Sequence, residues 1–495
     1  HTTISTVKHD ALAVFFSQEK SEHTKLIEMF PSLLRKKIES AIELNEFTGK
    51  ENGAVTLYTE SVIASPRLLL IGIGELKKLT LEKFRRAAAT AATYSTRLKA
   101  SSLAIVFPHQ ATNASLSSAE ISQAIVEGAV LSQYKFDKYR KPDNEKKKLR
   151  GVAIISSSSS TMREIERGVT VGRILCEAVY HARDLENAPS NEIYPETLAR
   201  YAQQAGRKYG FGVTVFDKRK IESLKMGGII GVSKGSENPP RFIILEHNRN
   251  AKKSGTAVLV GKGVTFDTGG ISIKPSASMA EMKMDMSGAG AVIGTFEAAA
   301  QLKIPVHLVG LIPAVENMPS GSAIKPGDII RHYNGTTSEV DNTDAEGRLI
   351  LADALGYASN YKPELAIDLA TLTGACVVAL GHLATGMMGN DNDLMNKLKE
   401  AGEKTYERVW QLPLFDEYEK QIKSDVADVK NVGGRWAGAI TAGWFLKKFI
   451  GDYKWIHLDI AGTAILEEAL DYAPKGGSGV GVRLLVEFLQ NRKKS

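Results

Sequence analysis

The segment Asn342–Arg348, which reads NTDAEGR, holds the densest group of chemically useful side chains in the sequence. Asp341 precedes it, and Asp344 and Glu346 stand two positions apart within it. Two carboxylates at positions i and i+2 of an extended segment point to the same side, and converging carboxylate oxygens suit a hard cation. Gly347 would allow the backbone to turn tightly beside such an ion. The segment therefore predicts one half of a metal site.

An ordinary helix N-terminus is the alternative interpretation of this segment. Apolar residues follow at helical spacing from Leu349, and Asp and Glu are favoured at helix starts as caps and by the helix dipole. The metal site is preferred because a second cluster upstream needs the same explanation.

The upstream cluster begins where an apolar strand, residues 257–260, meets a glycine-rich stretch whose spacing is not that of a phosphate loop. Lys262, Asp267 and Lys274 lie just past the strand, at the edge where open α/β sheets bind ligands. Asp285 opens the next helix, where a helix cap is its alternative role. Surface exposure is the alternative for the two lysines, but lysine is rarely placed in such apolar surroundings.

Two stretches, Val260–Lys274 and Asn342–Leu349, resemble the two signatures of the leucyl aminopeptidases, also called cytosol aminopeptidases. Members of that family are exopeptidases with two metal ions. Further stretches that resemble the family are 183–191, 226–245, 410–414, 425–445 and 458–463. The resemblance is close over about 180–485, whereas the N-terminal region resembles the family's accessory domain only in size and pattern.

The resemblance implies a set of metal ligands. A first, more exchangeable metal would be held by Asp267, Asp344 and Glu346, with help from the main-chain carbonyl of Asp344. A second would be held by Lys262, Asp267, Asp285 and Glu346, so that two of the carboxylates bridge the pair. Four carboxylates around two dications are close to neutral, whereas without metal they would raise one another's pKa values. A lysine ligand must be neutral, and a neighbouring dication lowers the pKa of its ammonium group.

The resemblance also implies the catalytic residues and the reaction. Lys274 would stabilise the developing oxyanion, and Arg348 would bind a bicarbonate ion that acts as general base. The expected enzyme is a leucyl aminopeptidase that releases N-terminal residues, preferably leucine and other apolar ones, through a metal-bridging hydroxide. Its apolar substrate pocket would be lined by Met282, Thr371, Gly374 and Ala464. Ordinary core packing is the alternative role of those pocket residues.

The expected cofactors are two divalent ions and bicarbonate. Oxygen-rich ligation suits Mn²⁺ and Mg²⁺ and is also compatible with Zn²⁺. Substrates would be peptides with a free N-terminus, and the resemblance implies a homohexamer built as a dimer of trimers. No His-Glu-x-x-His pattern occurs, which disfavours a single-zinc metallopeptidase. We therefore expect His332, His382 and His457 to have structural roles.

Two α/β domains are expected to position these residues. Alternating apolar runs and helical stretches predict an accessory domain over 1–160, with a largely buried sheet. A helix over 161–185 would connect it to a larger catalytic domain, 186–495, with a mixed central sheet flanked by helices. The expected strands are 11–16, 67–74, 102–107, 151–155, 212–216, 241–246, 256–261, 306–311, 365–369 and 455–459. The other expected helices are 80–101, 119–131, 196–209, 218–225, 288–301, 349–360, 393–409, 439–449 and 481–491.

The composition agrees with an ordinary globular protein. The 495 residues are 43% hydrophobic and 24% charged, enough chain for more than one domain. Cys176 and Cys376 are the only cysteines, so a reducing compartment is favoured over a disulfide framework. Neither a signal peptide nor a membrane-spanning run is expected, which points to the cytoplasm.

Two other functions remain open. Another two-metal hydrolase, such as a phosphatase, would share the carboxylates, but the lysine ligand with Lys274 and Arg348 fits acyl chemistry on an amine-bearing substrate. A function of a different class is an additional DNA-binding regulatory role, since some bacterial members of the family that the sequence resembles bind DNA. It rests on the net charge of +7 and on the basic segment Lys135–Arg150, for which a solvated surface is the ordinary interpretation.

Overall fold

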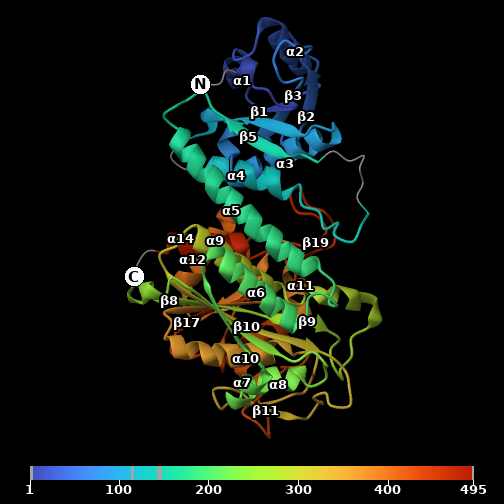
Figure 1. Cartoon of the computed structure of the whole chain (residues 1–495), viewed down its shortest axis with the longest axis vertical. Coiled ribbons are helices and arrows are strands. Elements are labelled where there is room, and N and C mark those ends of the chain that lie inside the picture. Colours follow the sequence, from blue (N-terminus) through green and yellow to red (C-terminus); the bar gives the residue numbers. More distant parts are fainter. Residues whose placement is uncertain (1–3, 113–115, 142–147, 493–495) are drawn as a thin grey trace. The chain divides into compact units, whose positions relative to one another are not determined.

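The computed structural model describes residues 4–112, 116–141 and 148–492. The chain divides into two compact units, one formed by His1–Glu177 with Glu468–Pro474 and the other by Ala178–Glu467 with Lys475–Ser495. Both are α/β units, as the sequence predicts (Figure 1).

One long helix and one basic segment need separate mention. The helix expected over 161–185 is α5, Met162–Asn187, which starts one residue later and ends two residues later than expected. The basic segment Lys135–Arg150 lies partly outside the described residues, because 142–147 are not among them. Within the described part of the chain, no helix is long and apolar enough to cross a membrane.

The smaller unit is built on a five-stranded sheet in the order β2-β3-β1-β4-β5. Its strands are β1 (Ala11–Ser17), β2 (Ala54–Tyr58), β3 (Arg67–Gly74), β4 (Ser102–Val106) and β5 (Gly151–Ile155). Its helices before α5 are α1 (Lys20–Ile27), α2 (Ser32–Glu43), α3 (Leu81–Arg97) and α4 (Ser118–Leu131). β2 pairs antiparallel with β3, while the other pairings are parallel.

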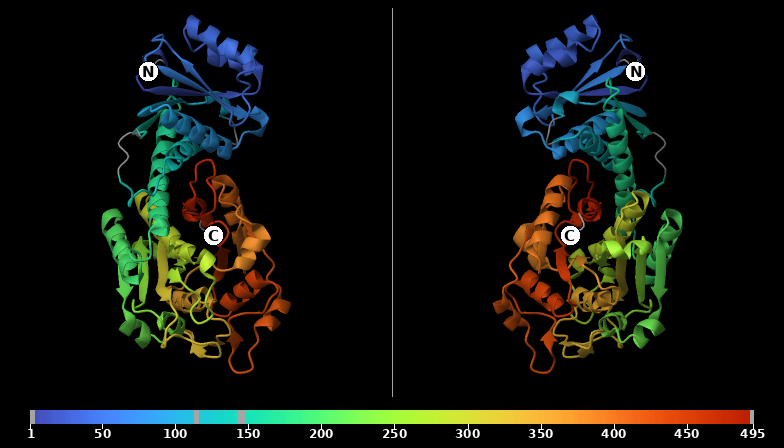
Figure 2. Two further views of the ribbon diagram at one scale, coloured as in Figure 1. Left: turned by 90° about the vertical axis from the view of Figure 1, so that its right-hand side faces the viewer. Right: turned by 90° about the vertical axis from the view of Figure 1, so that its left-hand side faces the viewer.

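The central strand β1 explains why this sheet is buried on both faces. All of its residues are buried, and successive side chains point to opposite faces of a strand. Its odd-numbered apolar residues pack with α3 and α4, and its even-numbered ones with α1 and α2. Figure 2 shows these helix layers on opposite sides of the strands. The edge strand β2, which the sequence analysis missed, is only partly buried and lacks this strong apolar signal.

The larger unit is organised around a nine-stranded mixed sheet in the order β15-β14-β17-β13-β8-β10-β7-β6, with β9 pairing on β10. β17, β13, β8 and β10 are parallel, whereas β14 and β7 run antiparallel to their inner neighbours. The strands are β6 (Gly212–Phe216), β7 (Arg241–His247), β8 (Thr256–Gly261), β9 (Gly263–Asp267), β10 (His307–Asn317), β13 (Leu365–Ala370), β14 (Thr385–Gly389), β15 (Val409–Gln411) and β17 (Lys454–Asp459). Two small sheets are formed by β11 (Ile329–Arg331), β12 (Thr337–Glu339) and β16 (Val429–Lys430), and by β18 (Ile465–Leu466) and β19 (Gly476–Gly477).

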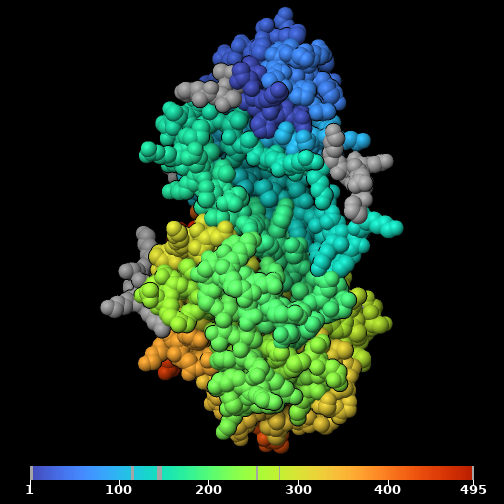
Figure 3. Space-filling model, in the orientation of Figure 1, coloured from blue at the N-terminus to red at the C-terminus, as the bar shows by residue number. Residues whose placement is uncertain are grey.

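Helices cover both faces of the large sheet. They are α6 (Pro195–Tyr209), α7 (Lys218–Ser223), α8 (Gly227–Ser233), α9 (Ser287–Gln301), α10 (Gly347–Ala358), α11 (Gly374–Leu380), α12 (Asn392–Thr405), α13 (Gly438–Lys447) and α14 (Val482–Asn491). α8, α10 and α13 share a core with one sheet face, through residues such as Val258, Leu351 and Phe445. α9 packs on β8, with α6 and α14 against it. The green surface in Figure 3 belongs to the stretch that carries α6, α7 and α8.

The prediction failed for the two strands that matter most to the site. It ended β10 at residue 311, whereas the strand continues to Asn317, and it gave no strand where β9 lies. β9 pairs only with the far part of β10, and the register shifts at Val315 and Glu316. Because this pairing joins segments about 50 residues apart, local periodicity does not reveal it.

Candidate metal centre

The expected site residues gather at the carboxyl ends of neighbouring strands. Lys262 follows β8, Asp267 is the last residue of β9, and Thr371 follows β13. α10 begins at Gly347, directly after the acidic segment. This edge of an α/β sheet is where ligands bind, so the fold places the candidate residues in a suitable position.

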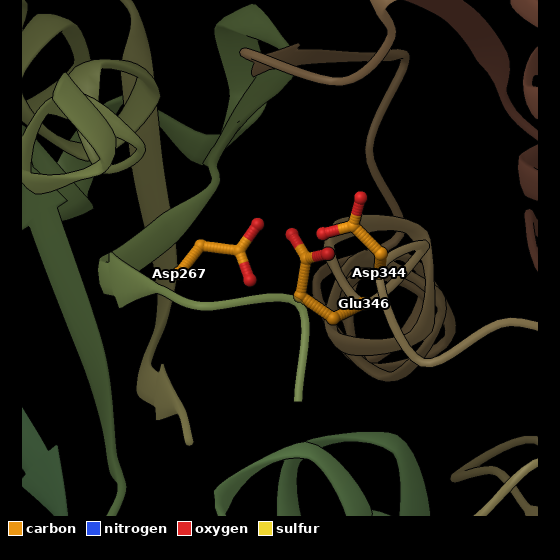
Figure 4. A group of neighbouring side chains, drawn as sticks. All are labelled: Asp267, Asp344 and Glu346. Carbon is orange, nitrogen blue, oxygen red and sulfur yellow. The ribbon is translucent and has the colours of Figure 1, made fainter. Parts of the chain in front are cut away.

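Asp267, Asp344 and Glu346 point toward one another (Figure 4). One carboxylate oxygen of each lies within 4.8 Å of the others. The extended geometry expected for Asp344 and Glu346 is wrong: Asp344 lies in a turn, and Glu346 has φ −80° and ψ −35°. The Asn342 side chain makes this turn by accepting a hydrogen bond from the Asp344 N–H at 2.8 Å. Asp341 is exposed and is not one of these three converging carboxylates.

The helix-cap alternative fails for both acidic clusters. Glu346 occupies the N-cap position of α10 but its side chain makes no capping hydrogen bond. Asp285 precedes Met286, the N-cap of α9, which also makes no side-chain cap. Instead, Asp285 Oδ1 accepts hydrogen bonds from Lys262 Nζ at 2.8 Å and from Thr371 Oγ1 at 2.7 Å.

Lys262, Asp285 and Glu346 form what we call the buried corner of the site. Lys262 Nζ lies 2.8 Å from Asp285 Oδ1 and 2.8 Å from Glu346 Oε1, and it donates to the Thr371 carbonyl at 2.7 Å. Only 4% of the Lys262 side chain is exposed, which excludes the surface-lysine interpretation. Its main chain is fixed on both sides, since its N–H donates to Leu369 and its carbonyl accepts from Ala289.

Gly347 contributes space rather than a turn. The residue lies in the first turn of α10, with ordinary helical backbone, so the expected tight turn is not its role. A Cβ at this position would lie 2.6 Å from Cε and 2.8 Å from Nζ of Lys262. Any larger residue would therefore push the lysine out of the buried corner.

Lys274, Asp267 and Asp344 form the open corner. Lys274 Nζ lies 2.9 Å from Asp267 Oδ2 and 2.5 Å from Asp344 Oδ1. The Lys274 side chain is 21% exposed and that of Asp344 is 31% exposed. Gly269 and Gly270, with φ of +87° and +68°, make the left-handed turn that leads to Lys274.

Burial dominates the protonation of the carboxyl groups. Burial and the neighbouring Glu346 carboxylate raise the pKa of Asp267 to about 6, although Lys274 opposes them. Burial also raises the pKa of Asp285 well above its ordinary value, and that of Asp344 above its own. For Glu346, the nearby lysine charges outweigh burial and hold the pKa below its ordinary value.

Both lysines remain cations in these surroundings. Burial alone would lower the pKa of Lys262, but attraction to Asp285 and Glu346 outweighs it and raises the pKa. The same balance, with Asp267 as the main partner, raises the pKa of Lys274. Positive charge among these carboxylates is therefore strongly favoured.

Arg348 lies beside this group on the first turn of α10 and is only 6% exposed. Its Nη1 donates to the Asn431 carbonyl at 2.7 Å. Among the residues described, its buried Nε has no hydrogen-bond acceptor. Burial lowers the pKa of the guanidinium to about 10, although Glu346 and Asp459 oppose the shift. The guanidinium is thus a desolvated cation that could accept a small anion.

Three polar residues that the sequence analysis did not single out join the two acidic segments. Asn317 Nδ2 donates to Asp267 Oδ1 at 2.8 Å and to the Thr343 carbonyl at 3.0 Å. Thr343 Oγ1 donates to the Gly269 carbonyl and accepts from the Ser272 N–H. The sequence offered one signal for this role, which is that Asn317 is the last residue of a strand. That signal could be read only by extending β10 to its pairing with β9, and the sequence analysis missed this pairing.

Asp459 holds the opposite side of the site, and it too was not predicted. It is the last residue of β17 and is 1% exposed. Its Oδ1 accepts from the Leu372 N–H at 3.1 Å, and its Oδ2 accepts from Thr373 Oγ1 at 2.7 Å. These bonds fix the turn after β13, whose Thr371 bonds to both Lys262 and Asp285.

The four residues expected to line the substrate pocket differ in burial and in their contacts with the candidate metal centre. Thr371 is in the site through its hydrogen bonds, and the Met282 carbonyl accepts from the Asp285 N–H at 3.3 Å. Gly374 begins α11 and is exposed. Ala464 is fully buried and its N–H donates to Ile460, whose own N–H donates to Ala370 at the end of β13. The pocket role of these four residues stays a prediction.

The three histidines expected to be structural bond within the fold. His332 Nε2 lies 2.7 Å from Ser338 Oγ, and His382 Nδ1 lies 2.7 Å from the Gly462 carbonyl. His457 Nδ1 lies 2.5 Å from Asp368 Oδ1, and attraction to that carboxylate outweighs burial and raises its pKa.

Comparison with known families matches both units. Residues 180–486 match the catalytic domain of the cytosol aminopeptidase family, and residues 11–143 match the N-terminal domain of the same family. A probable cytosol aminopeptidase from a Geobacter species is 48% identical over 451 residues, which is 91% of each chain. A probable cytosol aminopeptidase from Chlorobaculum parvum is 46% identical over 505 residues, covering 98% of this chain and 97% of its own.

Solved structures with the same fold include a plant aminopeptidase and a maturation enzyme. A tomato leucine aminopeptidase mutant superimposes with a TM-score of 0.87 at 33% identity, over 99% of this chain and 95% of its own. The bottromycin maturation enzyme BotP in complex with Mn superimposes with a TM-score of 0.86 at 32% identity, over 97% and 99%.

Proposed function

The chain belongs to the cytosol aminopeptidase family, and from that premise we propose that it is a leucyl aminopeptidase. The family makes it a metal-dependent peptidase that acts on peptides. The proposal adds that it removes N-terminal residues one at a time and prefers leucine and other apolar ones. The observation that carries it is the convergence of four carboxylates and two lysines at one sheet edge.

The donor set fits two divalent cations. Asp285 Oδ2 is buried and, in the described part of the chain, accepts no hydrogen bond. The raised pKa values of Asp267, Asp285 and Asp344 mean that these carboxylates need more positive charge to stay ionised. Asp267, Asp344 and Glu346 would hold one cation, and Lys262, Asp267, Asp285 and Glu346 the other. When bound, the cations would activate a shared water at neutral pH and polarise the scissile carbonyl. Mn²⁺ is the first candidate, with Zn²⁺ and Mg²⁺ as others.

Lys274 is the residue best suited to stabilise the transition state. It is a cation in the open corner, where part of its side chain remains accessible. An ammonium group fixed there would stabilise the negative charge that develops on the carbonyl oxygen during attack. Lys262, by contrast, is enclosed in the buried corner, and it would serve as a ligand after losing a proton.

Arg348 would hold the general base. Its buried Nε and its planar guanidinium suit a bicarbonate ion, which would take a proton from the attacking water. Asn431 orients the guanidinium through one hydrogen bond from Nη1, and the buried Nε would donate to the anion.

Substrate selection would come from the turn after β13 and from η5, Ser276–Met284. Met282, Thr371, Gly374 and Ala464 would line an apolar pocket for the first side chain, and the free α-amine of the substrate would bind one of the two cations. The buried corner lies against Thr371, so the pocket would be close to the reacting carbonyl.

The direct test is hydrolysis of leucine p-nitroanilide by metal-stripped protein after Mn²⁺, Zn²⁺ or Mg²⁺ is returned. We expect activity only with metal, and none on the N-acetylated substrate because its amine is blocked. Equal cleavage of the acetylated compound would overturn the aminopeptidase assignment, and activity after chelation would overturn the metal centre.

The assembly and domain organisation complete the proposal. The accessory domain would span 1–160, the connecting helix 161–185 and the catalytic domain 186–495. The enzyme would be a homohexamer, a dimer of trimers, in the cytoplasm. Light scattering of the active enzyme tests this, and a mass equal to one chain would contradict it.

A further inference from the structure

Asn431 makes an unusually complete set of hydrogen bonds beside the metal centre. It follows β16 and is 0% exposed. Its Oδ1 accepts from the N–H groups of Asp341 at 2.8 Å and Asn342 at 3.2 Å. Its Nδ2 donates to the carbonyls of Asn342 at 2.7 Å and Ala345 at 3.3 Å. An asparagine amide has two donors and two acceptor sites, and here all four are used.

These four bonds enclose the turn that presents the acidic ligands. The turn runs from Asp341 to Ala345, so it includes Asp344 and ends directly before Glu346. On its other side the turn is held by Asn317, which donates to the Thr343 carbonyl. The backbone of residues 341–345 is irregular and is not part of any strand. The side-chain amides of Asn317 and Asn431 therefore make the hydrogen bonds that a neighbouring strand would otherwise make.

The main chain of Asn431 acts on a second part of the site. Its carbonyl accepts the hydrogen bond from Arg348 Nη1 at 2.7 Å, and its N–H donates to the Glu339 carbonyl of β12 at 3.0 Å. A single residue thus connects the ligand turn, the arginine and the small sheet that anchors it.

We propose that Asn431 is the positioning residue that sets Arg348 and the Asp344–Glu346 ligands in one fixed relation. The inference rests on the proposed function for the roles of Arg348 and the carboxylates. Asn431 does not touch the reacting atoms, and it acts through the groups that do. Partners of this kind typically change metal affinity or activity by about 10–100-fold when they are removed.

Two variants test the proposal. Asn431→Ala removes all four side-chain bonds, whereas Asn431→Asp keeps the shape and the acceptor but loses both donors and faces two carbonyls with a carboxylate. For each, we expect kcat to fall by about 10–100-fold with little change in KM, and Mn²⁺ affinity measured by calorimetry to fall by a similar factor.

Asn390→Ala is the matched control. Asn390 also clamps two backbone groups, since its Oδ1 accepts from the Trp455 N–H and its Nδ2 donates to the Tyr453 carbonyl. Those bonds lie at the start of β17, at the opposite end of the strand from Asp459. We expect Asn390→Ala to lower the melting temperature without changing kcat or Mn²⁺ affinity.

A double-mutant cycle separates positioning from general stability. If Asn431 acts through Arg348, then Asn431→Ala should cost far less kcat in the Arg348→Ala background than in the wild type. Equal losses in both backgrounds, unchanged kcat and Mn²⁺ affinity, or the same loss in Asn390→Ala would each overturn the proposal. If both Asn431 variants unfold, the residue is structural and the proposal also fails. A wild-type protein that binds Mn²⁺ but does not cleave leucine p-nitroanilide would instead refute the proposed function, while calorimetry would still report on Asn431.

Discussion

The two corners of the candidate metal centre have the same kinds of charged side chain at different depths. In the buried corner, Lys262 and Asp285 have side chains that are 4% and 8% exposed. In the open corner, Lys274 and Asp344 are 21% and 31% exposed at similar ion-pair distances. Burial strengthens electrostatic interactions and slows exchange, while exposure admits water and substrate. The comparison favours a tightly held metal and a ligand lysine in the buried corner, and an exchangeable metal and a catalytic lysine in the open corner.

The depth of each corner follows from the elements around it. Lys262 is fixed between the ends of β8 and β13 and the start of α9, which are buried on all sides. Lys274 follows a turn formed by Gly269 and Gly270, whose later residues reach the surface. A rigid strand end and a partly exposed turn thus give two lysines of one site different surroundings.

The largest effect should come from Glu346, a buried carboxylate whose charge interacts with both lysines. Glu346→Gln keeps the shape but removes the charge shared by the two corners, so activity should fall beyond the roughly 10²–10³-fold typical of one lost electrostatic donor. Asp344→Asn should also abolish turnover. Circular dichroism should show folded proteins, and substantial turnover with both metals bound would refute the ligand assignment.

Replacing each of the two lysines by alanine should impair a different property of the enzyme. Lys274→Ala should bind both metals and substrate but lose about 10²–10³-fold in kcat, because its charge acts mainly in the transition state. Lys262→Ala should instead lose the metal of the buried corner. Metal analysis beside steady-state kinetics measures both effects. If Lys274→Ala lost a metal while Lys262→Ala kept both, the two roles would have to be exchanged.

Metal release should occur in two phases. On addition of a chelator, the metal of the open corner should leave at least about tenfold faster than the other, a difference of roughly 1.4 kcal/mol in barrier. Stopped-flow release of Mn²⁺ into a chromogenic chelator measures the two rates. Asp344→Asn should accelerate only the fast phase, and a single phase in the wild type would contradict the distinction between the corners.

The smallest expected effect concerns pH and the metal-free protein. Asp267 has a pKa of about 6 in the folded state, above its ordinary value of 3.8. The folded state therefore keeps a proton that the unfolded state loses between those values, so this group makes the free energy of unfolding decrease as pH rises from about 4 to about 6. Metal-free protein should melt a few °C higher at pH 5 than at pH 7, and this difference should shrink in Asp267→Asn. An unchanged difference in the variant would show that Asp267 is not the group responsible.

The sequence predicted most of the regular elements because their signals are local. β3, β5, β6 and β8 end where their apolar runs end, and α9 and α10 follow their helical spacing. The fold class and the identity of the acidic and basic residues that converge were likewise readable, since these residues stand beside the ends of strands or directly before helices.

The geometry of those residues was less predictable. The extended form expected for Asp344 and Glu346 was replaced by a turn that the Asn342 side chain holds. Gly347 was expected to bend the backbone, whereas it makes room for Lys262 from another segment. In each case the controlling contact comes from a side chain, which residue spacing alone does not describe.

The sequence by itself determined which groups are available and which strand ends carry them, because hydrophobic periodicity sets local structure. Tertiary structure alone decided how deeply each lysine is buried and which uncharged residues hold the ligands. Asn317 bonds Asp267 across 50 positions, Asn431 bonds Arg348 across 83, and Thr371 bonds Lys262 across 109. Such contacts depend on strand register and on the packing of helices against the sheet, so they exist only once the chain has folded.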